Sequence, residues 1–282
     1  MNNKTAVVTG TSSGFGLSTS IELARKGLTV IAAMRNSNKS SDLMKEARKH
    51  GVESKIIVLE LDVTNEKSIL AFQTLVIENF GRVDVLINNA GYAGAGFVEE
   101  VSMDEYRKQF ETNVLGVFAV TKAFLPLMRE QKQGCIINIS SISGKVAFPG
   151  LSPYIASKHA IEGWSESLRL EMQPFGVKVV LIEPGSYKTN IWSTGKQVAA
   201  ESLQSHSPYK DYMQSIERYI AAGENSFGDP LEVATKIAEI AVAENPDIRY
   251  PIGRGVKASI FLKNFLPWRL WEKIIIKKLF VK

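Results

Sequence analysis

The stretch KTAVVTGTSSGFGLSTSIELARKG, residues 4–27, joins a short apolar run to an amphipathic one through a turn rich in glycine. Residues 4–9 are β-branched and apolar, which predicts a buried strand, and 14–26 carry apolar side chains at helical spacing. The glycines between them allow a tight turn in which the backbone approaches a ligand closely. The free N–H groups of the following helix then suit a pyrophosphate. Taken alone, the pattern suits a purely structural turn equally well.

The same alternation continues along the chain. Further strands are predicted over 28–34, 54–61, 83–88, 134–140 and 177–183, and helices over 41–50, 66–80, 102–131, 154–173 and 230–243. The strands are apolar on both faces, as strands covered by helices on both sides must be. Strand followed by helix, repeated, predicts an α/β fold: a doubly wound, mostly parallel, Rossmann-like sheet with helices on both faces. The pattern weakens after about residue 185, so we expect an elaborated C-terminal third with an edge strand at 248–252.

The composition is that of a globular protein, with 45% hydrophobic and 22% charged residues among 282. Cys135 is the only cysteine, so no disulfide can form within the chain, which favours a reducing compartment. The sequence shows no secretory signal and no uninterrupted apolar run of roughly 18 residues, which favours a cytoplasmic protein without a spanning helix. The three histidines are scattered and suggest no metal site.

The second predicted strand ends in AAMRN, at the position where an NAD site commonly places an acidic residue on the ribose 2′-hydroxyl. Met34, Arg35 and Asn36 offer no carboxylate, and Arg35 can pair with a 2′-phosphate instead. A solvated surface charge is the alternative interpretation of Arg35. The position favours NADP(H), with NAD as the second candidate.

Tyr154 and Lys158 lie four residues apart, so they share one face of the predicted helix 154–173. A free phenol has a pKa of about 10, and a neighbouring cation lowers it. The pair is therefore predicted to be a proton donor with its activating cation. An ordinary pair on an exposed helix is the alternative. No G-x-S-x-G motif is present, so serine hydrolase chemistry is not supported.

Several motifs occur together in the order and spacing of one family. They are Gly10-Thr11-Ser12-Ser13-Gly14-Phe15-Gly16, Asn88-Asn89-Ala90-Gly91, Asn113, Ser141, Tyr154-x-x-x-Lys158 and Pro184-Gly185. With them the chain resembles the short-chain dehydrogenases/reductases, in their compact single-domain branch near the hydroxysteroid and retinol dehydrogenases. The resemblance covers residues 4–190 closely and 225–252 loosely.

The resemblance implies hydride transfer between a nicotinamide cofactor and a carbonyl or secondary alcohol, with Tyr154 as proton donor or acceptor, and Arg35 makes NADP(H) the expected cofactor. It implies catalytic roles for Asn113, Ser141, Tyr154 and Lys158. It implies cofactor contacts for Gly10, Ser12, Ser13, Gly14, Phe15, Gly16, Arg35, Asp62, Val63, Asn89, Ala90, Gly91, Tyr154, Lys158, Pro184, Gly185 and Thr189. Two departures stand out: Tyr187 replaces a small aliphatic residue beside the nicotinamide, and Ser13 stands where many NADP-dependent members carry a basic residue.

The substrate side is expected to be apolar and aromatic. Its candidate residues are Tyr187, Ile191, Trp192, Tyr209, Tyr212, Met213, Tyr219 and Phe227, with Phe97, Phe148 and Leu151 from other loops. Such a wall suits a bulky hydrophobic ketone or alcohol, although ordinary packing is the alternative. The family habit implies a homodimer or homotetramer. A non-catalytic NAD(P)-binding sensor on the same fold is the competing function.

The net charge of +5 is unevenly distributed. Residues 254–282 contain eight Lys and Arg against one acid, a charge of +7, so residues 1–253 carry −2. We therefore expect a dinucleotide-binding and catalytic domain, 1–253, and a basic amphipathic tail, 254–282. A helix begun by Pro267 would gather Trp268, Trp271, Ile275 and Leu279 on one face.

This tail has the profile of a helix lying on anionic lipid, and the third functional hypothesis is a membrane-associated scaffold. A helix docked on a neighbouring subunit and a lid over the substrate mouth are the alternatives. Nucleic acid is not expected as a partner, because no recognition motif accompanies the charge and the body of the chain is slightly acidic.

Overall fold

Seven strands form one sheet in the computed structural model of the chain, which describes residues 4–192 and 195–280. The strand order is β3-β2-β1-β4-β6-β7-β9, and each neighbouring pair is parallel. The strands are β1 (Thr5–Thr9), β2 (Thr29–Met34), β3 (Ile56–Glu60), β4 (Val85–Asn88), β6 (Gly134–Ile139), β7 (Val177–Pro184) and β9 (Arg249–Ile252). The predicted strands and the edge position of 248–252 are confirmed.

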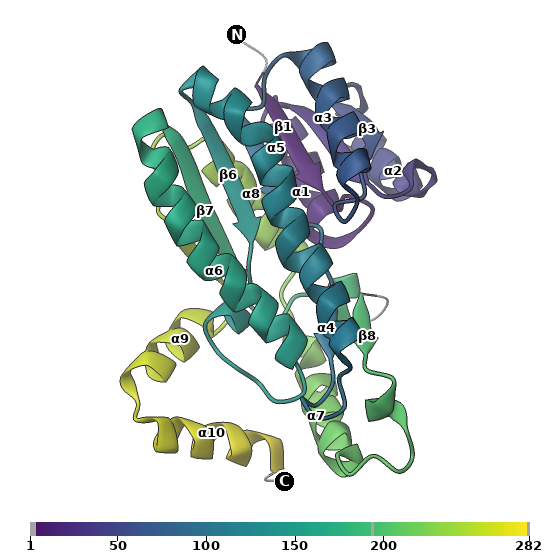
Figure 1. The fold of residues 1–282 in the computed structure, drawn as a ribbon, viewed down its shortest axis with the longest axis vertical. Helices are drawn as coiled ribbons and strands as arrows, with labels where there is room; N and C mark the ends of the chain where they lie inside the picture. Colours follow the sequence, from purple (N-terminus) through teal and green to yellow (C-terminus); the bar gives the residue numbers. More distant parts are fainter. Residues whose placement is uncertain (1–3, 193–194, 281–282) are drawn as a thin grey trace.

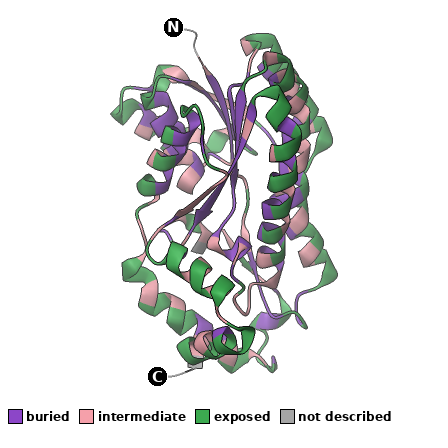
Figure 2. Ribbon diagram, turned by 90° about the vertical axis from the view of Figure 1, so that its left-hand side faces the viewer, coloured by how far each residue is buried: buried purple, intermediate pink, exposed green. Residues whose placement is uncertain are grey.

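Helices cover both faces of the sheet, as Figure 2 shows for the buried strands between two exposed outer layers. In β1 the side chains of Ala6 and Val8 enter one core and that of Val7 enters the other, because successive residues of a strand face opposite sides. One layer consists of α1 (Gly14–Arg25), α2 (Ser41–Lys49) and α8 (Pro230–Ala241), and the other of α3 (Glu66–Phe80), α5 (Gly116–Gln131) and α6 (Ser152–Met172). The doubly wound fold is therefore confirmed.

The predicted helix 102–131 has an interruption. It consists of α4 (Met103–Phe110), a π-helical turn (Glu111–Leu115) and α5. By length and composition alone, Met103–Gln131 could cross a membrane. In this fold Val120, Phe124 and Met128 are fully buried in the core beneath the sheet, so the apolar stripe of the helix has a packing role.

Four elements escaped the sequence analysis. Strands β5 (Ala93–Ala95) and β8 (Lys196–Val198) pair in a separate two-stranded sheet, and each is too short to show a periodic pattern. Helices α7 (Lys210–Gly223) and α9 (Val256–Phe265) lie in the elaborated C-terminal third. The predicted tail helix is present as α10 (Trp268–Phe280). In Figure 1, α7, α9 and α10 lie at the end of the molecule towards which β6 and β7 point.

Candidate active site

The glycine turn between β1 and α1 is closely packed. Gly10 and Gly14 have φ of +70° and +57°, a conformation that favours glycine. A Cβ on Gly10 would lie 2.8 Å from the Cα of Ala90, and one on Gly16 would lie 2.3 Å from the carbonyl oxygen of Gly10. Ser13, at the helix N-cap, makes no capping hydrogen bond through its side chain. The first turn of α1 thus keeps N–H groups for a ligand, as an anion site at a helix N-terminus requires.

A second turn, after β4, is tied to the first by Thr9. Its hydroxyl oxygen accepts hydrogen bonds from the backbone N–H groups of Asn89 and Ala90, both at 3.0 Å. The Asn89 side-chain amide donates to the carbonyl oxygens of Thr9 at 2.8 Å and Gly10 at 3.0 Å. The sequence analysis missed Thr9, because its only signal in the sequence is a threonine at the end of a predicted strand. These bonds fix the crevice between β1 and β4, where the strand order reverses and ligands of such sheets bind.

One cavity of about 1,270 Å³ opens at the carboxyl ends of the strands. It brings together almost all of the predicted cofactor residues. Those lining it are Gly10, Ser12, Ser13, Gly14, Phe15, Arg35, Asp62, Val63, Asn89, Ala90, Gly91, Tyr154, Lys158, Pro184, Gly185 and Thr189. Gly16 is not among the lining residues, because it lies under the turn against Gly10. Its role is therefore to let the helix pack against the turn.

The cavity is positively charged beyond β2. Arg35 is exposed there, and Lys39, which the sequence analysis missed, lines the same region. Asp62 and Glu232 are the only acidic residues among the lining residues in the described part of the chain. The Asp62 carboxylate accepts bonds from the backbone N–H and hydroxyl of Thr64, at 2.9 and 2.8 Å. Within residues 4–192 and 195–280, no carboxylate thus lines the cavity at the end of β2.

Ser141, Tyr154 and Lys158 meet in the same cavity. Ser141 follows β6, and the other two lie on the first two turns of α6, which begins at Ser152 and has Pro153 in its first turn. The Ser141 hydroxyl is hydrogen-bonded to the Tyr154 phenol. The Lys158 ammonium donates to the carbonyl oxygen of Ile139 at 2.7 Å and lies 5.5 Å from the centre of the Tyr154 ring. The spacing-based expectation that these two side chains share one face is confirmed.

The expectation of a lowered pKa for the Tyr154 phenol is wrong. Burial raises the pKa of the Tyr154 phenol to about 12, against the opposing effect of the Ser141 hydrogen bond. Burial also lowers the pKa of Lys158 to about 8, against the attraction of Glu162. The sequence shows that a cation lies near the phenol, which lowers its pKa, but it does not show that both groups are buried, which has the larger effect on the pKa of Tyr154. At neutral pH the phenol therefore keeps its proton.

Asn113 does not line the cavity. It lies in the π-helical turn and is buried, and its side-chain amide brackets the backbone of Tyr92. The oxygen accepts from the Tyr92 N–H at 3.1 Å, and the nitrogen donates to the Tyr92 carbonyl at 3.0 Å and to the Ser157 hydroxyl at 3.3 Å. Since Tyr92 lines the cavity, Asn113 holds a segment of its wall in place.

Tyr187 is almost fully buried and closes the cavity beside the glycine turn. Its ring meets Phe15 edge to face, with the centroids 5.6 Å apart, and its hydroxyl donates to the Glu232 carboxylate at 2.9 Å. A Cβ on Gly228 would lie 2.4 Å from the ring, so only glycine leaves room there. Tyr187, which replaces the small aliphatic residue usual in the family, is thus accommodated by Phe15, Glu232 and Gly228.

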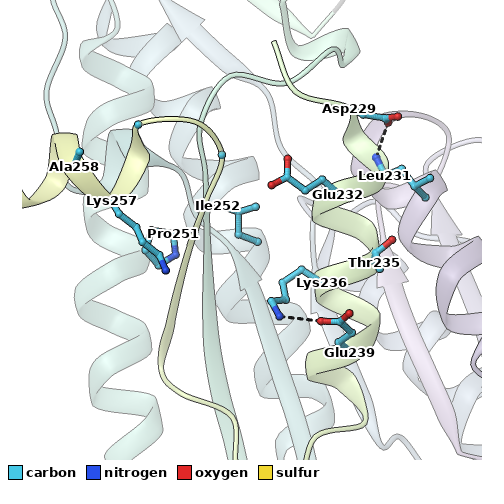
Figure 3. Close-up of a pocket in the computed structure, with 12 residues that line it drawn as sticks. Asp229, Leu231, Glu232, Thr235, Lys236, Glu239, Pro251, Ile252, Lys257 and Ala258 are labelled. Atoms are coloured by element: carbon cyan, nitrogen blue, oxygen red, sulfur yellow. Dashed lines mark hydrogen bonds and ion pairs between the residues drawn. The ribbon is translucent and has the colours of Figure 1, made fainter. Parts of the chain in front are cut away.

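A second hollow of about 890 Å³ lies between α8 and the loop after β9. Figure 3 shows Glu232 projecting from the first turn of α8, with the Lys236–Glu239 ion pair (2.8 Å) further along the helix. None of the predicted catalytic residues lines this hollow, and Glu232 contacts both hollows.

The far end of the main cavity is lined mostly by apolar side chains. Of the aromatic and apolar residues expected on the substrate side, Phe148, Leu151, Tyr187, Ile191, Tyr219 and Phe227 line it. Phe97, Tyr209, Tyr212 and Met213 instead pack against one another around α7, which contains Tyr212 and Met213. For these four residues the alternative of ordinary packing holds. The side chain of Trp192 lies outside the described residues. The structure adds wall residues from α7 and α10: Ile216, Ile220, Trp271, Ile275, Lys278 and Leu279.

Known proteins resemble the chain along most of its length. The short chain dehydrogenase family profile matches residues 4–199. An uncharacterized oxidoreductase, YusZ, of Bacillus subtilis is 47% identical over 281 residues, which is 99% of this chain and 100% of that protein. A 3-ketodihydrosphingosine reductase of Bacteroides thetaiotaomicron is 35% identical and covers 94% of this chain and 93% of its own length.

Solved structures show the same fold. A short-chain dehydrogenase from Streptomyces avermitilis superposes with a TM-score of 0.82 at 33% identity, over 97% of both chains. An actinorhodin polyketide ketoreductase variant with NADPH has a TM-score of 0.76 at 32% identity, over 90% of this chain and 97% of that one. A Burkholderia phymatum member in complex with NAD has 0.78 at 27%, over 98% and 95%. The chain therefore belongs to the short-chain dehydrogenase/reductase family of oxidoreductases.

Proposed function

We propose that the protein transfers a hydride between NADP(H) and the carbon of a bulky hydrophobic ketone or secondary alcohol. Tyr154 supplies or accepts the accompanying proton. The observation that carries this proposal is the meeting of Ser141, Tyr154 and Lys158 in the one cavity onto which the glycine turn also opens. An exposed Tyr–Lys pair, the alternative at the sequence level, is incompatible with the burial of both side chains.

The residues fit a dinucleotide. The glycine turn leaves room where a Cβ would collide with its neighbours, and α1 begins without a side-chain cap. When bound, the nicotinamide would accept or donate the hydride, and its oxidised form would add a positive charge to the site.

Side chains of the protein donate or accept the proton that accompanies the hydride. Because its pKa is about 12, the Tyr154 phenol is protonated at neutral pH and can give its proton to the oxygen of a carbonyl substrate. The Ser141 hydroxyl orients that phenol and is placed to donate to the developing oxyanion. The Lys158 ammonium, 5.5 Å from the ring centre, stabilises the phenolate left behind. One hydride and one proton thus convert the carbonyl to an alcohol.

The preference for NADP(H) rests on Arg35. This guanidinium and Lys39 line the cavity beyond β2, where none of the described residues offers a carboxylate to bind a ribose 2′-hydroxyl. A fluorescence titration with NADPH and NADH tests the preference. We expect NADPH to bind at least tenfold more tightly, and Arg35→Asp to abolish or reverse that ratio, since it replaces an attractive charge by a repulsive one. Equal ratios in the two proteins would remove Arg35 from the cofactor site.

The preference for a hydrophobic substrate rests on the apolar far wall of the cavity, formed by α7 and α10. Two of the similar proteins carry names that denote a ketone substrate, the 3-ketodihydrosphingosine reductase and the polyketide ketoreductase. A panel of ketones of increasing chain length, with NADPH consumption as the readout, is the corresponding test. We expect kcat/KM to rise with chain length.

Tyr154→Phe tests the assigned proton donor. Without the hydroxyl we expect kcat to fall by at least about a hundredfold, the usual worth of a general acid, while the Kd for NADPH stays within about twofold. Tyr250→Phe is the matched control, because its hydroxyl accepts a bond from the Asp247 N–H at the edge strand and does not line the cavity. Retained turnover in Tyr154→Phe would refute the assignment. A wild-type protein that binds NADPH but reduces no ketone would favour the sensor hypothesis.

A further proposal concerns assembly and location. We keep the homodimer or homotetramer and the cytoplasmic location as predictions. Sedimentation equilibrium and fractionation of the native cells measure them directly.

A further inference from the structure

Helices α9 and α10 form an arm, residues 256–280, at the end of the molecule towards which β6 and β7 point (Figure 1). Trp271 is buried on the inner face of α10, and Ile275 and Leu279 are half-buried on the same face. All three line the cavity. The sequence left three interpretations of this face open: contact with lipid, contact with a neighbouring subunit, and a lid over the cavity. In the structure Trp271, Ile275 and Leu279 line the cavity, as a lid would, whereas Trp268, which was predicted on the same face, is exposed.

The outer surface of the arm carries a different apolar group. We name Phe261, Leu262, Phe265 and Trp268 the outer patch, and their side chains are 58%, 45%, 72% and 60% exposed. The rings of Phe261 and Phe265 stack with their centroids 4.3 Å apart, and the ammonium of Lys263 lies 5.8 Å from the Trp268 ring. Apolar surface gathered in this way marks an interaction site.

A row of cations continues along α10 from Trp268, the last residue of the outer patch. Arg269, Lys273 and Lys277 recur at intervals of four along α10 and are exposed. In the described part of the chain no ion pair neutralises them. The last 29 residues carry +7, whereas the rest of the chain carries −2. Exposed aromatic rings beside a row of cations are the two elements that hold a helix on an anionic lipid surface.

Charge also argues against the other occupant, a second copy of the chain. Two arms meeting at their outer patches would bring two strongly positive segments together, and such a contact is repulsive. An anionic bilayer instead neutralises the cations and takes up the aromatic rings. The lipid surface is therefore the occupant that the charge distribution favours.

We propose that the arm docks on an anionic lipid bilayer through the outer patch and so presents the cavity to the membrane. Because α10 carries lipid-facing cations on one side and cavity-lining side chains on the other, a hydrophobic substrate can pass from the bilayer into the cavity beside this helix. The docking surface is independent of the catalytic chemistry. The entry of substrate rests on the proposed function.

Sedimentation with vesicles of phosphatidylcholine, with and without phosphatidylglycerol, tests the docking surface. We expect the full chain to sediment with the anionic vesicles, and less so at high salt, because screening weakens the contribution of the cations. The double variant Phe265→Glu/Trp268→Glu should bind roughly tenfold or more weakly. The double variant Leu70→Glu/Leu75→Glu on α3 makes the same charge change at exposed apolar positions outside the arm and should bind as the wild type does.

Three results would overturn the docking proposal: no binding of the wild type to anionic vesicles, equal binding of the two double variants, or conversion of an oligomer to a monomer by Phe265→Glu/Trp268→Glu in lipid-free solution. The last result would assign the patch to a second copy.

Kinetics then test substrate entry. With a long-chain ketone held in vesicles, Phe265→Glu/Trp268→Glu should raise KM at least tenfold, and with a short water-soluble ketone its kcat and KM should match the wild type. An unchanged KM for the vesicle-held ketone would refute entry from the bilayer. Vesicle binding by a wild type that reduces no ketone would refute the proposed function and still confirm the docking surface.

Discussion

The ammonium of Lys158 donates a 2.7 Å hydrogen bond to the carbonyl oxygen of Ile139, the last residue of β6. This bond ties α6 to the end of a central strand, next to the segment that delivers Ser141 to the Tyr154 phenol. Helix and strand therefore place the three side chains relative to one another. The cation is positioned by the backbone of the sheet as well as by the helical spacing.

The stability of the protein should depend on Lys158 in alkaline solution. Its pKa of about 8 in the folded protein lies below the ordinary lysine value of 10.5, so between these pH values the unfolded chain binds more protons and stability rises with pH. Relative to Lys158→Met, the wild type should gain ~2 kcal/mol between pH 8 and 10. Urea unfolding at a series of pH values measures this gain. Parallel curves for the two proteins would contradict the lowered pKa.

Tyr187 should support both stability and cofactor binding, through separate parts of its side chain. Tyr187→Phe keeps the ring against Phe15 and loses only the bond to Glu232, so we expect a loss of about 1 kcal/mol and unchanged NADPH affinity. Tyr187→Ala removes the buried ring and should cost about 3–5 kcal/mol. It should also weaken NADPH binding, since Phe15 lies in the first turn of α1. Thermal unfolding and an NADPH titration distinguish the two variants, and similar behaviour would contradict this division.

Two glycines should respond in opposite directions to alanine. In Gly16→Ala the new Cβ would meet the Gly10 carbonyl oxygen at 2.3 Å, so we expect a displaced turn, a lower Tm and lost NADPH binding. Gly163 is exposed in α6 and has no atom within 4 Å of the added Cβ, so Gly163→Ala should stabilise the helix by about 0.5–1 kcal/mol. Calorimetry of both variants checks this. A stable, NADPH-binding Gly16→Ala protein would show that the turn is not closely packed in solution.

Glu183 should make the protein less stable as pH rises through the weakly acidic range. It is buried with Glu162 near Lys145 and Arg249, and burial, with repulsion by Glu162, raises its pKa from 4.5 to about 7. The folded protein then binds more protons than the unfolded chain between pH 4.5 and 7, so stability falls as pH increases across that window.

The neutral variant Glu183→Gln should remove this component. Its unfolding free energy, compared with that of the wild type from pH 4.5 to 7, should show a flatter or rising profile. Glu166, the exposed carboxylate that also pairs with Arg249, provides the control, since Glu166→Gln lacks the burial that causes the shift. A wild-type profile that Glu183→Gln leaves unchanged would place the titration on another group.

Much of the fold is local enough to be predicted from the sequence. The apolar runs became strands within about two residues of the expected bounds, because β-branched segments between turn residues have few alternatives. The three-residue strands β5 and β8 were missed because each exists only through pairing with a partner about 100 residues away. The same holds for Thr9, whose hydroxyl matters only because Asn89 and Ala90 approach it.

By itself, the sequence determined the strand–turn–helix at residues 4–27, the parallel sheet that follows from its repetition, and the shared helix face of Tyr154 and Lys158. These features depend on backbone conformation and on the period of apolar side chains, which are local properties. Only the tertiary structure decided that Lys158 binds the Ile139 carbonyl, that burial holds the proton on Tyr154, and that the apolar face of α10 meets a cavity. Burial and contact depend on segments that are distant in the chain. The apolar side chains on one face of a helix do not specify which surface packs against them.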